Sequence, residues 1–231
     1  MKSFGDHIDQ QRLYTQEIAE FAYITKNTHN IQELGVVDGS TIYLFKSNTP
    51  NGILVTAGWQ GDEPAGWQAC KNLCETIPSA SFIPIVSPSC FVSRQHFNDY
   101  SRNVDASWPD VVTTEGKVLQ ENIELLTSLS SKAFFSLQED RKRGVSYFYT
   151  WGDVAVDLKQ SIHDTMNHHI PQWNSGDRSA PDRGLFGAYI VSCGSKQAFQ
   201  IETPADGTYP LAKRIECQSD TVRTIVQILK V

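Results

Sequence analysis

The chain has 231 residues, of which 20% are charged, and its net charge is −6 at neutral pH. This length and composition are typical of a globular chain that forms one core and exclude extended disorder. No cluster of Lys and Arg occurs beyond Arg141–Arg143, so nucleic acid and anionic membranes are poor partners.

The sequence carries no sign of export or membrane insertion. The N-terminus lacks the apolar segment of a secretory signal, and no apolar run approaches the roughly 20 residues that span a bilayer. Five cysteines occur without a Cys-x-x-Cys pair, which is typical of a reducing compartment. We therefore expect a cytoplasmic protein.

In the first half of the chain, strand signals follow an initial helix. Apolar residues near helical spacing predict a helix over 9–27. Asp38-Gly39 separates two apolar runs and is a strong hairpin signal. A second helix is expected over 67–77, and the strands are expected over 31–37, 41–45, 53–56 and 82–86.

The second half alternates helices and strands. A long polar loop is expected over 88–113 and another over 171–183. We expect helices over 118–129, 154–169 and 220–231, and strands over 133–137, 147–149, 186–191 and 198–201. The alternation predicts an α/β fold. It is expected to form a single domain over 1–231, with a mixed, twisted sheet flanked by helices.

The turn after the strand over 53–56 is the strongest functional signal. Gly58 opens the turn, and Pro64 suits the first turn of the following helix. Gln60 and Glu63 are thereby fixed three residues apart at the carboxyl end of a strand. Open α/β sheets place their sites at that edge.

Four stretches, in this order, resemble the zinc carboxypeptidase family, and the first is closest to its murein peptide amidase-like branch. The turn resembles the His-x-x-Glu metal motif, with Gln60 at the histidine position. A polar loop then resembles the substrate-binding segment. The third stretch resembles Leu-His-Glu-Asp with Gln138 at the histidine, and the fourth matches the Glu-Thr-Pro of the catalytic strand. The four stretches are, in order, Trp59–Gly66, Ser93–Trp108, Phe134–Asp140 and Phe199–Pro204.

The resemblance implies roles for five side chains. Gln60, Glu63 and Gln138 take the positions that bind zinc or another divalent metal, Glu202 takes the general-base position, and Arg94 fits the arginine that steadies an oxyanion. Two amides in place of two imidazoles change the metal chemistry, because zinc favours nitrogen and sulfur ligands whereas amide oxygens suit harder ions.

The substrate-binding loop also departs from the family. The Asn-Arg pair that would hold a substrate carboxylate aligns with Asp105-Ala106, and a carboxylate there repels an anionic terminus. Asn103 and Asp105 are the expected substrate contacts, and Arg102 could reach the same space from a different position.

None of the six histidines stands at a family position. His96, in the substrate-binding loop, is the best replacement ligand. The cluster His163, His168 and His169 has a metal-free explanation, since a helix C-terminus favours protonated histidine. His7 and His29 are expected at the surface.

Two functions are consistent with these features. The first is a metallocarboxypeptidase-like hydrolase of small peptides, including cell-wall peptides with D- or diamino acids. The retained Glu202 and Arg94 favour it. The second is a catalytically inactive relative that binds a peptide or small ligand in the former cleft. The two glutamines and Asp105 favour it.

Overall fold

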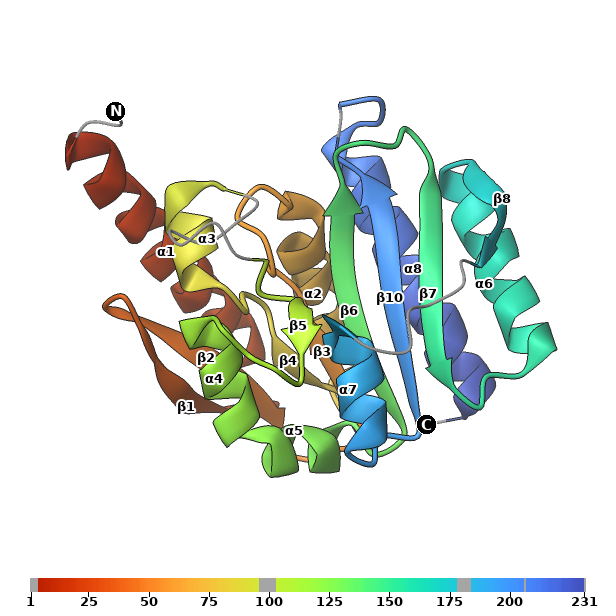
Figure 1. Ribbon diagram of the computed structural model, residues 1–231, viewed down its shortest axis with the longest axis horizontal. Helices are drawn as coiled ribbons and strands as arrows, with labels where there is room; N and C mark the ends of the chain where they lie inside the picture. Colours follow the sequence, from red (N-terminus) through yellow and green to blue (C-terminus); the bar gives the residue numbers. More distant parts are fainter. Residues whose placement is uncertain (1–3, 96–102, 178–183, 206, 231) are drawn as a thin grey trace.

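The computed structural model describes residues 4–95, 103–177, 184–205 and 207–230. Within these ranges the central sheet has the strand order β1-β2-β4-β3-β6-β10-β7-β8 (Figure 1). Strands β4, β3, β6 and β10 are parallel, while β2 and β7 run antiparallel to them. The predicted α/β class with a mixed sheet is confirmed. The strands are β1 His29–Val37, β2 Ser40–Ser47, β3 Ile53–Thr56, β4 Ser81–Ile83, β6 Ala133–Asp140, β7 Ser146–Gly152, β8 Gln172–Asp177 and β10 Gln197–Pro204.

Helices cover both faces of the sheet (Figure 1). One face packs against α2, α6 and α8, and the opposite face packs against α4, α5 and α7. Helices α1 and α3 lie beside β2, and a separate small ladder joins β5 to β9. These elements are α1 Phe4–Thr25, α2 Pro64–Thr76, α3 Pro88–Ser93, α4 Thr114–Glu121, α5 Ile123–Leu129, α6 Val156–His169, α7 Phe186–Ser192, α8 Leu211–Leu229, β5 Ala106–Trp108 and β9 Gly184–Leu185.

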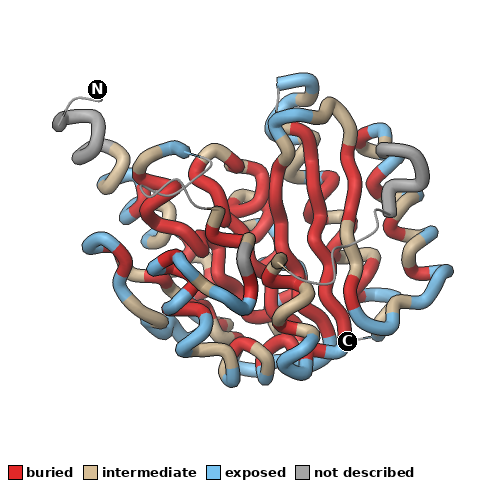
Figure 2. Tube along the Cα trace, in the orientation of Figure 1, coloured by how far each residue is buried: buried red, intermediate tan, exposed pale blue. Residues whose placement is uncertain are grey.

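Strand alternation determines which side chains meet in the site. Along β6, Phe135 and Leu137 join the core against α2 and α8, whereas Phe134 joins the core against α7. Successive side chains point to opposite faces, so Ser136 and Gln138 share the face of Phe134. These central strands are buried on both faces (Figure 2). The polar residues at their carboxyl ends therefore lie inside the protein.

The hairpin between β1 and β2 confirms the turn signal. Asp38 and Gly39 have φ of 49° and 79°, and Val37 pairs with Ser40. Two consecutive positive φ values are those of a type I′ turn, whose twist suits a tight hairpin.

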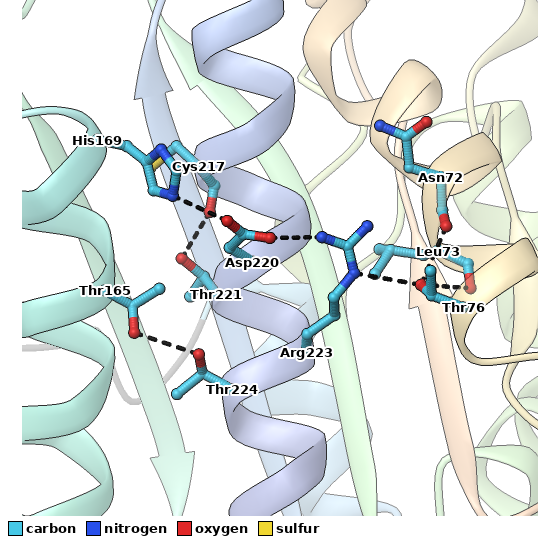
Figure 3. Close-up of polar contacts among 10 residues, drawn as sticks. All are labelled: Asn72, Leu73, Thr76, Thr165, His169, Cys217, Asp220, Thr221, Arg223 and Thr224. Atoms are coloured by element: carbon cyan, nitrogen blue, oxygen red, sulfur yellow. Dashed lines mark hydrogen bonds and ion pairs between the residues drawn. The ribbon is translucent and has the colours of Figure 1, made fainter.

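Polar contacts tie together the helices on the face away from the site (Figure 3). His169 Nε2 on α6 lies 3.0 Å from Asp220 Oδ2 on α8. Arg223 on α8 forms an ion pair with Asp220 and donates from Nε to Thr76 Oγ1 of α2 at 3.2 Å. His169, at the end of α6, thus belongs to a contact between helices and not to the cleft.

The expectation of a strand over 186–191 was wrong, because Phe186–Ser192 forms helix α7. A short apolar run fits either structure by periodicity alone. Phe186 and Ile190, one helical turn apart, are both buried, and Gly187 packs on the Trp151 ring with no space for a side chain. Tertiary packing therefore selects the helix.

Several element limits also differ from expectation. The loop over 88–113 contains α3 and β5, and the loop over 171–183 contains β8. The helix over 118–129 is divided at Asn122, and the last helix begins at Leu211. Ser87 accepts a hydrogen bond from Cys90 N at 3.4 Å, and Pro88 follows it, which is a standard start of a helix.

Candidate functional site

The turn after β3 is held rigidly between neighbouring segments. Gly58 has φ of 61°, and a Cβ on Gly61 would lie 1.6 Å from the Cys90 carbonyl oxygen. Only glycine permits that approach. Glu63 precedes α2 and Pro64 is its first residue, as predicted. Trp59 is fully buried and packs on Phe186, so it belongs to the core.

Gln60 and Glu63, from this turn, are in direct contact. One end of the Gln60 amide lies 2.5 and 2.6 Å from the two Glu63 carboxylate oxygens, and the amide also approaches Asn103 Oδ1 at 3.3 Å. With its nitrogen toward Glu63, the amide donates to that carboxylate. Burial, and then the charge of Glu202, raises the pKa of Glu63 well above its ordinary value.

Gln138, near the carboxyl end of β6, is engaged by a second carboxylate. Its Nε2 donates to Asp105 Oδ2 at 2.7 Å and to Ser136 Oγ at 2.8 Å. Asp105 Oδ1 accepts from the backbone N–H of Phe186 at 3.2 Å. Asp105 therefore links β6 to the start of α7. Burial raises the pKa of Asp105 to about 7, although both hydrogen bonds oppose the rise.

Glu202, on β10, lies beside Gln138 on β6 and Tyr147 on β7 in the strand register. Gln200 Nε2 donates to its Oε1 at 2.7 Å. Burial is the main cause that raises the pKa of Glu202 to about 8, and the charges of Asp140 and Asp105 add to it. This carboxyl group is therefore mostly protonated at neutral pH.

The side chains from these strands line one cleft. It has a volume of about 280 Å³, and its walls come from the turn, the segment before β5, and the strands β6, β7 and β10. The structure thus brings together six of the predicted site residues: Gln60, Glu63, Asn103, Asp105, Gln138 and Glu202.

Sequence reasoning missed several lining residues, and strand alternation could have found two of them, Gln200 and Asp140. Gln200 precedes Glu202 by two residues, and Asp140 follows Gln138 by two, so each shares its neighbour's face. Tyr147, interpreted only as a strand residue, donates from Oη to Asp140 Oδ2 at 2.7 Å.

The structure does not bring Arg94 into the cleft. Its Nε donates to Gln10 Oε1 of α1 at 2.7 Å, and its side chain lines a different cavity. The arginine therefore has no contact with the position of an oxyanion in the cleft. Arg102 and His96 lie outside the described residues.

Glu139 and His29 have structural roles. Glu139 forms an ion pair with Arg214 of α8 and accepts from Ala65 N at 2.9 Å, which secures the first turn of α2. The surface placement of His29 was wrong, since it is 5% exposed and its Nε2 lies 2.8 Å from the Ala80 carbonyl oxygen.

The donor chemistry of the cleft does not fit zinc. Gln60, Glu63 and Gln138 offer one carboxylate and two amides, whereas zinc sites use histidine and cysteine with occasional carboxylates. Among the described residues, no group of three His, Cys, Asp or Glu side chains is placed to hold a metal ion. Both amides have carboxylate partners within the protein.

Comparison with solved structures identifies the fold. A "putative metallopeptidase" from Shewanella denitrificans superimposes with a TM-score of 0.83 at 21% identity, covering 94% of this chain and 89% of that one. A second "putative metallopeptidase", from Shewanella amazonensis, gives 0.82 at 22% identity, with 96% and 94% covered. A metallo-carboxypeptidase from Burkholderia cenocepacia gives 0.71 at 12% identity, with 92% and 68% covered.

These similarities establish a metallopeptidase and carboxypeptidase fold for the chain, as the sequence motifs predicted. No protein-family profile and no curated protein matches the sequence. Within the described residues, no helix combines the length and apolar character that a membrane crossing requires.

Proposed function

We propose that this protein binds a small peptide in the cleft and does not hydrolyse it with zinc. One observation carries the proposal. The two amides at the histidine positions are paired with carboxylates, Gln60 with Glu63 and Gln138 with Asp105. Hydrogen bonds thereby hold together the side chains that a metal would otherwise organise. Glu202, mostly protonated at neutral pH, is a poor base there.

The charge of the cleft favours a ligand with an amino group. Glu202 and Asp140 line it together with the rings of Tyr147 and Tyr149. A bound ammonium group lowers the raised pKa of Glu202, so the ionised carboxylate forms a charge-assisted hydrogen bond with it, and the tyrosine rings add a cation–π attraction. A peptide that contains a diamino acid, as cell-wall peptides do, supplies such a group.

A second candidate is a peptide hydrolase that uses a metal other than zinc. The position of Glu202 favours it, since this carboxylate lies beside Gln138 in the same cleft as Gln60 and Glu63. The oxygen atoms of these three side chains suit a hard divalent ion. Such a hydrolase requires the Gln60 and Gln138 oxygens to face the ion, and it requires an ionised Glu202.

Calorimetric titration with alanyl-lysine and alanyl-norleucine tests the peptide proposal, because the two dipeptides differ in the side-chain ammonium group. We expect the lysine peptide to bind more tightly, and Glu202→Gln to reduce that preference. The matched control is Glu33→Gln, which removes an exposed carboxylate and should leave the preference for the lysine peptide unchanged. Equal binding of the two peptides, or no binding of either, would contradict the proposal.

Mass spectrometry of the same mixtures separates the two candidates. The binding function predicts an intact dipeptide with and without Mg²⁺, Ca²⁺ or Mn²⁺. Cleavage that requires one of these ions and is lost in Glu202→Gln would establish the hydrolase instead.

A reducing location is part of the proposal. All five cysteines are free, and four of them are buried. Free buried thiols suit the cytoplasm, where disulfides are rare.

A further inference from the structure

A second cavity lies on the other side of the turn that forms the cleft wall, and neither candidate function uses it. We propose that this cavity binds the carboxylate of a ligand whose body is apolar. The site residues are Arg94 and Arg141, with Leu13, Trp67 and Phe91 as the apolar wall. We call it the arginine cavity.

The turn separates the arginine cavity from the cleft. Gln60 and Glu63 line the cleft, whereas Gly61, Asp62 and Pro64 line the arginine cavity. The β6–β7 connection also contributes to both spaces, since Asp140 and Lys142 line the cleft and Arg141 lines the cavity. The cavity volume is about 570 Å³, against 280 Å³ for the cleft. The two spaces are therefore neighbouring sites with a common wall.

Both arginines are anchored in a way that leaves their terminal nitrogens for a ligand. Arg94 donates from Nε to Gln10 Oε1 at 2.7 Å, and Arg141 Nε lies 2.5 Å from Asp62 Oδ2. Among the described residues, no further polar partner is recorded for either guanidinium group. A guanidinium fixed through Nε presents its two terminal amino groups, which suit a carboxylate.

The acidic side chains of the cavity wall have basic partners. Glu17 forms a salt bridge with Lys71 at 2.7 Å, which Lys71 shares with Glu20, and Asp62 pairs with Arg141. Arg94 has no carboxylate partner within the described residues. The arginine cavity therefore offers an anion the guanidinium group of Arg94, which no carboxylate of the described residues pairs with.

The apolar wall defines the second half of the ligand. Trp67 and Phe91 pack edge to face at 5.0 Å and 64°, and Leu13 on α1 is 37% exposed. Pro64 completes this surface. An apolar or aromatic body fits against such a wall, while its carboxylate reaches the guanidinium groups.

The backbone at Arg94 sets the direction of its side chain. Arg94 ends α3 with φ of 51° and ψ of 43°, in the left-handed region that favours glycine or asparagine. Its backbone N–H bonds back to Phe91 O at 3.2 Å. A left-handed residue is a common way for a helix to end, and Lys230 after α8 has the same conformation. At Arg94 this conformation turns the chain so that the side chain faces α1.

Titration calorimetry with 3-phenylpropionate, N-acetylphenylalanine and the neutral 3-phenylpropanamide tests the proposal. We expect at least one acid to bind and the amide to bind weakly or not at all. Arg94→Gln or Arg141→Gln should weaken acid binding about tenfold, since each removes charge-assisted hydrogen bonds. Tighter binding of N-acetylphenylalanine assigns the cavity to peptide C-termini, and equal or tighter binding of phenylpropionate assigns it to free acids.

Three controls make the result decisive. Arg12→Gln removes the same charge from an exposed position on α1 outside the cavity and should leave binding unchanged. Leu13→Asp places a carboxylate in the wall and should abolish binding. Glu202→Gln alters the cleft alone and should have no effect, so failure of the peptide proposal stays distinguishable. Equal binding of acid and amide, no binding at millimolar concentration, or acid binding that survives both arginine substitutions overturns the proposal.

Discussion

The cleft and the arginine cavity share one wall but have opposite chemistry. In the cleft, buried carboxylates are paired with the amides of Gln60, Gln138 and Gln200. The arginine cavity is lined by Arg94 and Arg141 together with the aromatic side chains of Trp67 and Phe91. The short turn between them directs Gln60 and Glu63 to the cleft and Gly61, Asp62 and Pro64 to the cavity. A single strand–turn–helix connection can therefore build two sites with different ligands, one suited to a cation and one to an anion.

Gly61→Ala should have the largest effect, because it disrupts the wall between the two sites. The added Cβ would meet backbone atoms of Cys90, which cannot move away as a flexible side chain could. We expect a loss of about 3 kcal/mol or more in the free energy of unfolding, measured by urea denaturation, and weaker binding in both sites.

The matched control is Gly39→Ala. Gly39 has a positive φ, but an added Cβ would meet no other atoms, so the free energy of unfolding should fall by only about 1 kcal/mol. If both substitutions cost the same, steric contact at the turn is not what holds the wall.

Asp105→Ala should affect the cleft and leave the arginine cavity unchanged. It removes the acceptor of Gln138 Nε2 and of the Phe186 N–H, and leaves both donors buried. We expect a loss of about 2 kcal/mol in the free energy of unfolding, measured by urea denaturation. The exposed Asp110→Ala is the control and should be neutral. A destabilisation by Asp105→Ala no larger than that of the control would show that Asp105 does not organise the cleft.

The pH dependence of stability should distinguish the cleft from an ordinary acidic surface. The pKa of Glu202 is raised in the folded state from 4.5 to about 8, so the folded protein holds a proton that the unfolded chain releases. Its contribution to stability is full below pH 4.5 and is lost as the pH rises through about 8.

Glu202→Gln should therefore flatten the decline of the unfolding free energy with pH and stabilise the protein at alkaline pH. Urea denaturation of both proteins across this range measures the difference. If the unfolding free energies of the wild-type protein and the variant declined equally with pH, the pKa of Glu202 would lie near its ordinary value.

The smallest effect is expected on the face away from both sites. Arg223→Gln breaks the ion pair with Asp220 and the hydrogen bond to Thr76 at the partly exposed junction of α2 and α8. We expect a loss of about 0.5 kcal/mol in the free energy of unfolding, which added salt reduces. The affinity of each site for its ligand should not change. An altered affinity in the cleft would reveal coupling across the sheet.

The sequence predicted the framework of the cleft because local signals control it. Gly58 and Pro64 define the turn, and alternation along β6 and β10 directs Gln138 and Glu202 to one face. The location of the cleft follows from these features. The pairing of Gln138 with Asp105 does not, since Asp105 comes from a distant segment without periodicity.

The arginine cavity could not be predicted for a related reason. Placing Arg94 requires helix α3 and the left-handed conformation of Arg94, which follows the helix, and both fall in a segment whose sequence predicts a loop. Gln10 of α1, which holds Arg94, is 84 residues away in sequence. Helix α7 was missed because its apolar run fits a strand equally well until Trp151 and the neighbouring core are in place.

Zinc titration by calorimetry tests most directly the central claim that hydrogen bonds replace a metal in the cleft. We predict no stoichiometric zinc binding by the wild-type protein at micromolar concentration. The double variant Gln60→His plus Gln138→His, which supplies two imidazoles beside Glu63, should gain one zinc ion. Tight binding of one zinc ion by the wild-type protein, abolished by Glu63→Gln, would contradict the account.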